Sequence, residues 1–321
     1  MNITVILCTY NRCQSLANAL ASVASSVLPD SVDWEVLVVN NNSSDQTSEV
    51  VEEFRRRYPG RFRYLFEARQ GKSHALNSGI REARGEVLAF MDDDVTVEPM
   101  WLVNLTTALR DGTWVGVGGR VLPERNFSPP HWLSLSGRYG MGAILAFFDL
   151  GEVAGELDRP PYGTNMAFRR NVFEKYGGFR LDLGPCPGSE MRNEDTEFGY
   201  RLLAAGERLW YEPSAVVHHP APLTRLKKEY FLAWWFDYGR AAIRERGKRP
   251  EVWGIPRYYL TLAATGAIRV PAWTLRWILA WNPQRRFYWK CRVWRAAGEI
   301  AETYGQSRGP KSQEKIAIQQ T

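Results

Sequence analysis

The sequence is poor in cysteine and has no cysteine pattern that marks a metal site. Its 321 residues include only Cys8, Cys13, Cys186 and Cys291, with no CxxC pair and no His/Cys cluster at zinc spacing. A structural zinc site of the usual kind is therefore excluded. Cys8 falls in an apolar segment that we expect to be a buried strand, which favours reduced thiols in a cytoplasmic setting.

Long apolar runs are also missing. The apolar stretch at the N-terminus covers only residues 3–8 and no basic segment precedes it, so we expect no signal peptide. The longest uncharged apolar stretch, 258–268, is shorter than the ~20 residues that a bilayer-spanning helix needs. The sequence has no internal repeat, and only the polar tail 305–321 is expected to be disordered.

Charge is divided unevenly along the chain. Residues 221–321 hold 19 Lys and Arg against 7 Asp and Glu, a net charge of +12, which leaves −6 for residues 1–220. Eight of the 13 tryptophans also lie in the C-terminal third. This asymmetry indicates two parts with different partners.

Short apolar runs alternate with amphipathic stretches over the first 122 residues. Strands are expected at 3–8, 35–40, 63–66, 86–91 and 115–121, and helices near 13–26, 45–58, 72–83 and 99–109. This alternation predicts an α/β fold, with a mainly parallel, Rossmann-like sheet that is flanked by helices. A further strand is expected at 163–169, extended chain at 209–219, and a helical C-terminal region from about 226 to 301.

Polar clusters directly follow three of these strands, at residues 9–12, 40–45 and 92–94. In a parallel sheet, ligands bind beyond the carboxyl ends of the strands. We therefore expect the three clusters to converge on one rim of the sheet and to form a site there.

The most informative cluster is the aspartate triplet Asp92-Asp93-Asp94, which ends the apolar run 87–91. Adjacent carboxylates at the end of a buried strand raise each other's pKa or recruit a cation. Oxygen ligands of this kind suit Mg²⁺ or Mn²⁺, together with substrate phosphates. The alternative is a solvated acidic turn that caps the following helix.

The ordered motifs resemble those of the family 2 glycosyltransferases, nucleotide-sugar enzymes with the GT-A fold. The resemblance covers about residues 1–220. Its six pieces are residues 5–12 (VILCTYNR), 38–45 (VVNNNSSD), 77–79 (NSG), 90–94 (FMDDD), 163–170 (GTNMAFRR) and 193–195 (NED).

In that family an aspartate cluster holds a divalent ion on the nucleotide diphosphate. The resemblance makes Asp94 the direct metal ligand, supported by Asp92, and allows His219 to complete the metal shell. Adjacent strand residues point in opposite directions, so at most one of His218 and His219 should face the site. The residues that the resemblance places near the nucleotide are Thr9, Tyr10, Arg12, Asn41, Lys72, Asn77, Asp92 and Asp93. Asn41 stands where the family usually has an aspartate, which leaves the identity of the base open.

The resemblance makes Asp195 the catalytic base, with Glu194 orienting it or binding the acceptor. Inverting transfer needs one carboxylate to accept the proton of the attacking hydroxyl. Residues bordering the donor sugar and the acceptor are expected to be Gly163, Thr164, Asn165 and Arg169, the last as a phosphate contact. From the residues alone, Asp195 could equally be an acidic residue at a helix N-terminus.

The C-terminal third interleaves tryptophan with basic residues at helical spacing. We expect a catalytic domain over 1–222 and a basic helical region over 223–304, with peripheral membrane contact through 225–300. A subdomain packed on the core, or a homo-oligomer interface, is the alternative. Nucleic-acid binding is not expected, because no RNP, zinc or helix-turn-helix pattern accompanies the basic residues.

These expectations combine into an inverting glycosyltransferase that uses Mg²⁺ or Mn²⁺ and a nucleoside diphosphate sugar, with UDP favoured. The acceptor is expected to be a glycan or a lipid-linked glycan at the cytoplasmic face of the membrane. Two alternatives remain at this stage, a nucleotidyltransferase and a non-catalytic glycan-binding or scaffold protein. A nucleotidyltransferase is expected to have a Gly-rich, Arg/Lys-containing phosphate loop after the first strand, and this sequence has none there.

Overall fold

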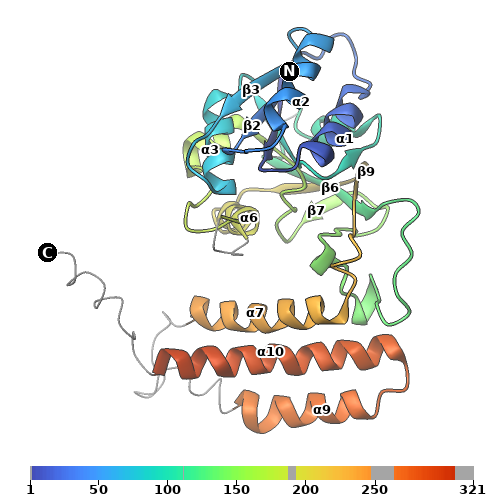
Figure 1. The fold of residues 1–321 in the computed structure, drawn as a ribbon. Coiled ribbons are helices and arrows are strands. Elements are labelled where there is room, and N and C mark those ends of the chain that lie inside the picture. Colours follow the sequence, from blue (N-terminus) through green and yellow to red (C-terminus); the bar gives the residue numbers. More distant parts are fainter. Residues whose placement is uncertain (1, 111, 187–192, 247–263, 308–321) are drawn as a thin grey trace, which may run out of the picture. The chain divides into compact units, whose positions relative to one another are not determined.

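The computed structural model describes residues 2–110, 112–186, 193–246 and 264–307 (Figure 1). The chain divides into two compact units. Unit 1 comprises residues 1–126 and 146–220, and unit 2 comprises 127–145 and 221–321. The segment 127–145 therefore groups with the C-terminal helices, although we expected it within the catalytic domain. Most of the expected disordered tail lies outside the described residues.

Unit 1 is built on one nine-stranded sheet with the order β3-β2-β1-β4-β8-β6-β9-β5, and β7 pairs with β9 (Figure 1). Its strands are β1 (Ile3–Thr9), β2 (Trp34–Asn40), β3 (Phe62–Phe66), β4 (Val87–Asp92), β5 (Thr96–Val97), β6 (Gly116–Pro123), β7 (Gly155–Leu157), β8 (Asn165–Arg169) and β9 (Leu209–His219). Helices connect and cover these strands, so unit 1 has the expected α/β architecture.

Strands β3, β2, β1 and β4 form the parallel half of the sheet. Nearly every side chain of β1, β2 and β4 is buried, as their continuous apolar sequences require when both faces of a sheet are covered. The register pairs Thr9 with Asn40 and Cys8 with Asp92. The carboxyl ends of the three strands are therefore level, which brings the three polar clusters to one rim.

The other half of the sheet is mixed. Strand β8 runs antiparallel to both β4 and β6, while β6 and β9 are parallel with an irregularity after Gly119. A Cβ at Gly119 would collide with the carbonyl oxygen of Ala215 and the amide of Asn165. Only glycine therefore permits this close approach between β6 and its neighbours.

The helices of unit 1 are α1 (Cys13–Ala24), α2 (Thr47–Arg57), α3 (Lys72–Glu82), α4 (Trp101–Thr107), α5 (Arg170–Tyr176) and α6 (Glu194–Ala204). The carboxylate of Asp45 caps the N-termini of both α1 and α2. It accepts hydrogen bonds from the backbone N–H of Cys13 at 2.9 Å and of Thr47 at 3.1 Å. One residue thus satisfies free donors at both helix N-termini and joins the loops that follow β1 and β2.

Unit 2 is helical, as expected. Its elements are η1 (Gly137–Tyr139), η2 (Gly142–Leu145), α7 (Lys228–Arg246), the π-helical turn η3 (Thr265–Arg269), α9 (Val270–Ile278) and α10 (Pro283–Ser307). Aromatic rings hold the segment 127–145 against the helices. Trp132 packs edge-on against Phe231 and Phe287, with centroids 5.3 and 4.5 Å away.

Helices α7 and α10 cross closely at two glycines, Gly239 and Gly298. We expect Gly298→Val to lower the free energy of unfolding of unit 2 by about 1–3 kcal/mol, because its side chain would overlap the carbonyl of Phe236. Urea unfolding followed by circular dichroism measures the change. Gly266→Ala is the matched control, since nothing lies within 4 Å of its Cβ position. Equal stability of both variants would show that the two helices need no close crossing.

No helix in the described ranges is both long and apolar enough to cross a membrane.

Candidate active site

The rim formed by the ends of β1, β2 and β4 carries tightly connected loops. The amide oxygen of Asn11 accepts from the backbone N–H of Ser44 at 2.7 Å, and the N–H of Asn11 donates to Ser43 Oγ at 2.9 Å. Asn11, Asn42 and Asn193 have φ angles of +52°, +65° and +88°. Asparagine is enriched among the non-glycine residues in the left-handed region. The sequence analysis placed these asparagines in polar clusters and motifs but did not predict their left-handed backbone.

The three aspartates of the triplet have different partners. Lys72 Nζ donates to Asp92 Oδ1 at 2.6 Å, and Thr164 Oγ1 donates to Asp92 Oδ2 at 2.8 Å. Burial alone would raise the pKa of Asp92, but the lysine charge and these hydrogen bonds outweigh it and lower the pKa to about 2. Asp92 is therefore an ionised anchor for Lys72 and Thr164.

Arg12 neutralises the other two aspartates. Its guanidinium lies 3.0 Å from Asp93 Oδ1 and 2.9 Å from Asp94 Oδ2. Burial raises the pKa of Asp93 to about 6, with a further contribution from the charge of Asp94 and in opposition to Arg12. The triplet is stable in this fold because two cations from other segments face it.

One buried oxygen of the triplet makes no hydrogen bond within the described residues. This atom is Asp94 Oδ1, which lies 3.7 Å from His219 Nε2. An orphaned carboxylate oxygen beside an imidazole nitrogen fits a divalent cation, which can accept a lone pair from each. Among the described residues no group of three or more His, Cys, Asp or Glu side chains could hold a metal. Two protein ligands suit Mg²⁺ or Mn²⁺ when phosphates and water complete the shell.

The neighbouring histidine faces away from this pair. His218 Nε2 lies 2.8 Å from Glu98 Oε1, and its Nδ1 lies 3.0 Å from the carbonyl oxygen of Pro123. Successive residues of β9 point to opposite sides, so His219 is directed toward Asp94. Glu98 also pairs with Arg125 at 2.7 Å. The sequence analysis missed this acidic partner of His218.

Lys72 joins the triplet to the start of α6. Its Nζ lies 3.6 Å from Glu194 Oε1, in addition to its bond with Asp92. Burial disfavours a charged lysine, but the two carboxylates outweigh it and hold the pKa of Lys72 well above its ordinary value. Burial also raises the pKa of Glu194, which is 4% exposed. Glu194 therefore supports Lys72, and its expected role of orienting Asp195 or binding the acceptor stays a prediction.

Asp195 is held in a fixed orientation beside Glu194. Its Oδ2 accepts from the N–H of Gly163 at 2.6 Å, and its Oδ1 accepts from the N–H of Thr196 at 2.6 Å. A Cβ at Gly163 would lie 3.0 Å from the carboxylate, so glycine is needed for this approach. Gly163 orients Asp195 while the next residue, Thr164, orients Asp92. The dipeptide 163–164 thus links the two carboxylate groups of the site.

Asn165 is a structural residue, and its expected contact with donor or acceptor is wrong. It is fully buried, and its amide oxygen accepts from Trp101 Nε1 at 2.8 Å. Its amide nitrogen donates to the carbonyls of Arg120 and Ala215, each at 2.8 Å. This side chain bonds β8 to its neighbours and has no surface toward a ligand.

Arg169 does not reach the rim, so its expected phosphate contact is also wrong. Strand β8 is antiparallel to β4, pairing Asn165 with Met91 and Arg169 with Val87. Four residues at about 3.4 Å each place Arg169 some 14 Å away along the strand. Its guanidinium donates there to the carbonyls of Trp114 and Leu109.

Two asparagine amides expected near the nucleotide are also used inside the protein. Asn41 is 5% exposed, donates to the carbonyls of Glu67 and Arg69, and accepts from the N–H of Gly71. Asn77 donates to the carbonyl of Phe179 and accepts from its N–H. Both amides therefore hold loops through backbone groups, and the expected nucleotide contacts of these residues stay predictions.

The loop after β1 keeps two of its expected ligand residues accessible. Tyr10 is 43% exposed and the Arg12 side chain is 45% exposed. Thr9 is only 3% exposed, so its expected nucleotide contact is corrected to a place inside the sheet.

A second residue that the sequence analysis missed is Glu67, which organises the loop between β3 and α3. Its carboxylate accepts from Arg69 Nε and Nη2, both at 2.9 Å, and from the hydroxyl of Ser78. The Arg69 hydrogen bonds, aided by Ser78, lower the pKa of Glu67 to about 2 from the ordinary 4.5, although burial opposes them. No motif indicated this residue, because its partners Arg69 and Ser78 lie in a loop and in helix α3 and form no recognisable pattern with it.

The lowered pKa of Glu67 predicts an acid-dependent loss of stability. The stabilisation is complete above about pH 4.5 and disappears as the pH falls toward 2, because the native state binds this proton more weakly than the unfolded chain does. We expect Glu67→Gln to cost about 2 kcal/mol at pH 7, allowing for solvent around Arg69, and almost nothing near pH 2. Urea unfolding between pH 7 and 2 measures this. Glu52→Gln, which removes an exposed pair, is the control, and a pH-independent difference would contradict the expectation.

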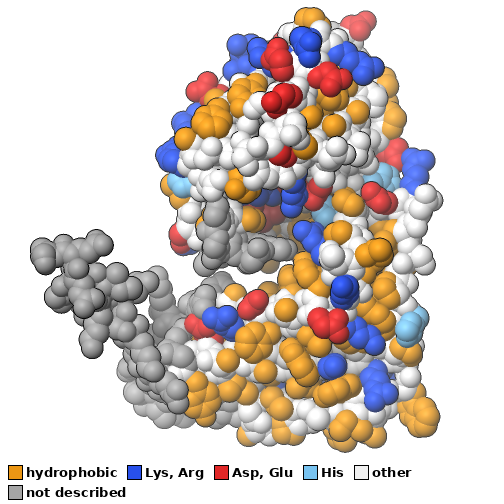
Figure 2. All heavy atoms as spheres, in the orientation of Figure 1, with side chains coloured by type: hydrophobic (Ala, Val, Ile, Leu, Met, Phe, Trp, Pro, Cys, Tyr) orange, Lys and Arg blue, Asp and Glu red, His pale blue; other side chains and the backbone are white. Residues whose placement is uncertain are grey.

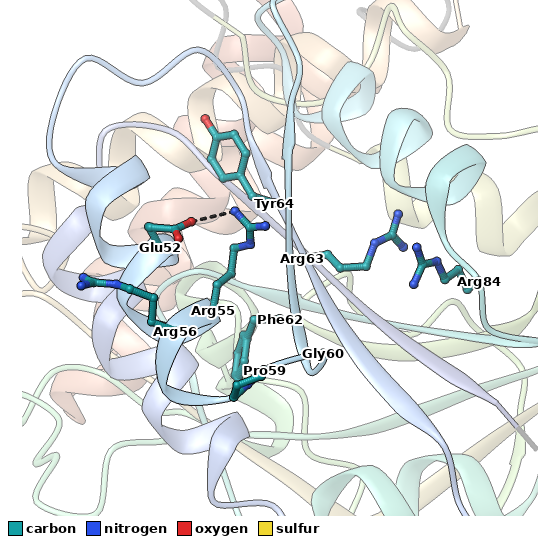
Figure 3. A pocket seen from close by; sticks show the side chains of 9 residues that line it. All are labelled: Glu52, Arg55, Arg56, Pro59, Gly60, Phe62, Arg63, Tyr64 and Arg84. Atoms are coloured by element: carbon teal, nitrogen blue, oxygen red, sulfur yellow. Dashed lines mark hydrogen bonds and ion pairs between the residues drawn. The ribbon is translucent and has the colours of Figure 1, made fainter.

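A hollow beside β3, the strand at one edge of the sheet, is also lined by charged side chains, but these do not point toward one common position (Figure 3). It is lined by Glu52, Arg55, Arg56, Pro59, Gly60, Phe62, Arg63, Tyr64 and Arg84. Figure 3 shows Arg55 and Tyr64 on one side of β3 and Arg63 on the other, with Arg55 paired to Glu52. Arg63 is bound to Glu35 at 3.0 Å. The arginines do not converge on one ligand position, so the rim remains the candidate site.

Comparisons with known proteins agree with this architecture. The chain is 31% identical over 235 residues to the succinoglycan biosynthesis protein ExoM of Rhizobium meliloti (strain 1021), covering 73% of this chain and 70% of that protein. It is 30% identical over 232 residues to the glycosyltransferase AglE of Haloferax volcanii, covering 71% and 70%. A solved structure, the mannosyltransferase PcManGT from Pyrobaculum calidifontis with GDP-Man and Mn²⁺, has the same fold, with a TM-score of 0.61 and 22% identity. That comparison covers 95% of this chain and 87% of the other.

The family model "Glycosyl transferase family 2" matches residues 4–177, more than half of the chain. The matched range contains the parallel half of the sheet, the aspartate triplet and the 163–164 link. The chain therefore belongs to glycosyl transferase family 2 and is a glycosyltransferase.

Proposed function

We propose that the chain transfers a sugar from a nucleoside diphosphate sugar to a glycan or lipid-linked glycan, with inversion at the anomeric carbon. The observation that carries the proposal is the pairing of two carboxylate groups by residues 163–164. One is the triplet with its orphaned Asp94 oxygen, and the other is Asp195. The solved mannosyltransferase, with GDP-Man and Mn²⁺, supports this class of donor.

Asp94 and His219 would hold a divalent cation, and the exposed Arg12 beside them would face the diphosphate. When bound there, the cation would offset the negative charge of the departing nucleoside diphosphate. Arg12 already balances Asp93 and Asp94, so the rim keeps a cation near the phosphates. Lys72 is committed to Asp92 and Glu194, which makes it a positioning residue for the site.

Asp195 would accept the proton of the acceptor hydroxyl as that oxygen attacks the anomeric carbon. The new C–O bond forms while the bond to the diphosphate oxygen breaks, and the proton passes to the Asp195 carboxylate. A single base with in-line displacement gives inversion. The N–H groups of Gly163 and Thr196 orient the carboxylate before the acceptor arrives.

The products of the reaction test this proposal. The chain is incubated with UDP-glucose, UDP-galactose, UDP-N-acetylglucosamine or GDP-mannose, with Mn²⁺, Mg²⁺ or EDTA, and with lipid-linked or free glycan acceptors. Metal-dependent release of free nucleoside diphosphate, with an inverted linkage by NMR, is the expected result. Release of pyrophosphate would indicate nucleotidyl transfer, and a retained configuration would remove Asp195 from the proposed role.

The curated relatives narrow the acceptor that we propose. ExoM is named for succinoglycan biosynthesis, and another relative from Haloferax volcanii, 25% identical over 75% of this chain and 76% of its own, is a glucosyl-dolichyl phosphate glucuronosyltransferase. Both names favour a growing polysaccharide or a lipid-linked glycan. The panel of acceptors above separates these two.

A further inference from the structure

The outer face formed by the π-helical turn η3, by α9 and by the turn that follows α9 is apolar and exposed. Ile268, Leu275, Ile278 and Leu279 are 68%, 58%, 65% and 63% exposed, and Trp281 is 99% exposed. Figure 2 shows hydrophobic side chains interspersed with Lys and Arg over the helices of unit 2, with few Asp or Glu. Scattered apolar residues are ordinary at a protein surface, but a contiguous set on one short helix marks an interaction site.

The periodicity of α9 separates this face from the one that packs inside unit 2. Trp273 is buried and joins Trp289 in a small core, with Trp277 packed against it. At 100° per residue, Leu275 and Leu279 fall on the opposite side of the helix from Trp277. A helix at the surface of a soluble protein normally carries polar residues on that outer side. In α9 both sides are apolar.

The charge around this face is mainly positive, and of its cations Arg269 and Arg295 already pair with the buried Glu299, at 3.9 and 3.0 Å. No Asp or Glu occurs between Glu251 and Glu299, whereas residues 264–298 contain seven basic side chains, which are Arg269, Arg276, Arg285, Arg286, Lys290, Arg292 and Arg295. Several lie over tryptophan rings, with Arg276 4.8 Å from the Trp289 centroid and Lys290 5.2 Å from that of Trp294. Cations held beside an apolar strip attract a surface that is itself both apolar and negatively charged.

We propose that α9 and Trp281 form a docking surface for a lipid bilayer that contains anionic lipids. With nine residues, α9 is about 14 Å long, which is far too short to span the ~30 Å hydrocarbon core but suits a helix lying in the interface. Trp281 would sit at the headgroup level, where tryptophan is favoured. Charge complementarity selects lipid over a second copy, because two copies would bring the same basic side chains together.

Sedimentation of the full-length chain with vesicles tests the docking surface separately from catalysis. We expect binding to vesicles of phosphatidylcholine with 30% phosphatidylglycerol, weak binding to pure phosphatidylcholine, and loss of binding as NaCl rises from 50 to 500 mM. A triple variant, Leu275→Ser with Ile278→Ser and Leu279→Ser, should lower the apparent affinity at least ~10-fold. Replacing Arg285 and Arg286 by Gln should cost about fivefold each at low salt.

Val153→Ser is the matched control, because this residue of unit 1 is 84% exposed and should leave vesicle binding unchanged. Trp281→Ser provides a second, single-site variant if the triple variant unfolds in thermal melts. Equal sedimentation of wild type and all variants would overturn the proposal, as would no sedimentation at all. A concentration-dependent dimer by light scattering that the triple variant abolishes would assign the face to a second copy instead.

Discussion

Replacing Asp195 with asparagine is expected to lower kcat by about 10²- to 10⁴-fold, while the affinity for UDP with Mn²⁺ stays within about twofold of wild type. The substitution replaces the carboxylate by an amide, which cannot accept the proton of the acceptor hydroxyl. It leaves the residues around Asp94 untouched, since the hydrogen bonds of Asp195 within the described ranges go to Gly163 and Thr196. Release of nucleoside diphosphate from the active donor measures kcat, and calorimetric titration with UDP and Mn²⁺ measures binding.

The geometry explains why this variant should separate chemistry from binding. Gly163 and Thr164 are adjacent, yet one bonds the base and the other bonds Asp92. An asparagine oxygen can still accept from the N–H of Gly163, so the 163–164 link keeps its position. The loss should therefore appear in kcat with little change in nucleotide affinity.

Glu197→Gln is the matched control for Asp195→Asn. Glu197 is a carboxylate in the same helix, but its partner is Arg201 at 2.7 Å, away from the 163–164 link. This control should retain most of the activity. Near-normal turnover by Asp195→Asn would remove Asp195 from the mechanism, and a parallel loss of UDP binding would show that it acts on the nucleotide side.

The sequence predicted the site where strand direction alone decides position. Three polar clusters follow apolar strands, and parallel pairing brings the carboxyl ends of those strands level. The convergence of the clusters on one rim needed no information beyond this pattern. Alternation along β9 likewise limited the site to one of two histidines.

The sequence could not show which polar side chains are already paired inside the protein. Asn41, Asn77 and Asn165 lie in the family's motifs, yet each amide is satisfied by groups distant in sequence. A short motif does not contain these partners, because they come from other strands and loops. The prediction for Arg169 is wrong for a different reason. The antiparallel direction of β8 is set by its neighbouring strands, and it places Arg169 at the end of β8 that is far from the rim.

The grouping of residues 127–145 with unit 2 was also hidden from the sequence. The segment is rich in proline and glycine and has no period that assigns it to a sheet or a helix. Its anchors are single aromatic rings, such as Trp132 against Phe287 and Tyr139 against Tyr288. Packing between residues about 150 positions apart decides its place, and local propensity does not.

Replacing Asp94 with asparagine is the second large expected effect. We expect the Mn²⁺-dependent gain in UDP affinity to fall by at least the ~10–100-fold that loss of an outer metal-site partner costs. The physical reason is the orphaned Oδ1 of Asp94, which is buried, makes no hydrogen bond to any described residue and lies 3.7 Å from His219. Titration of UDP by calorimetry, with and without Mn²⁺, measures the gain directly and does not depend on turnover.

The neighbouring aspartates provide the controls, because their partners differ. Asp93→Asn leaves the contact between Arg12 and Asp94 in place, so most of the metal dependence should remain. Asp92→Asn removes the carboxylate closest to Lys72 and should lower thermal stability, because it leaves this half-buried lysine with Glu194 at 3.6 Å as its ion-pair partner. Asp94→Asn should change the metal-free Tm less, since its Oδ1 has no hydrogen bond to lose and the half-exposed Arg12 that contacts its Oδ2 keeps Asp93 as a partner.

These three variants together decide how the triplet is divided. If Asp94 holds the ion, the Asp94 variant loses the Mn²⁺-dependent gain in UDP affinity and keeps its Tm. The Asp92 variant then shows mainly a lower Tm. His219→Gln should then reproduce the Asp94 result, because both side chains face the same position from β9 and from the end of β4. If Asp93→Asn instead abolished the metal effect and Asp94→Asn did not, the ion would sit on the Arg12 side of the triplet. The orphaned oxygen would then be only a consequence of burial, and the proposed role of His219 would fall with it.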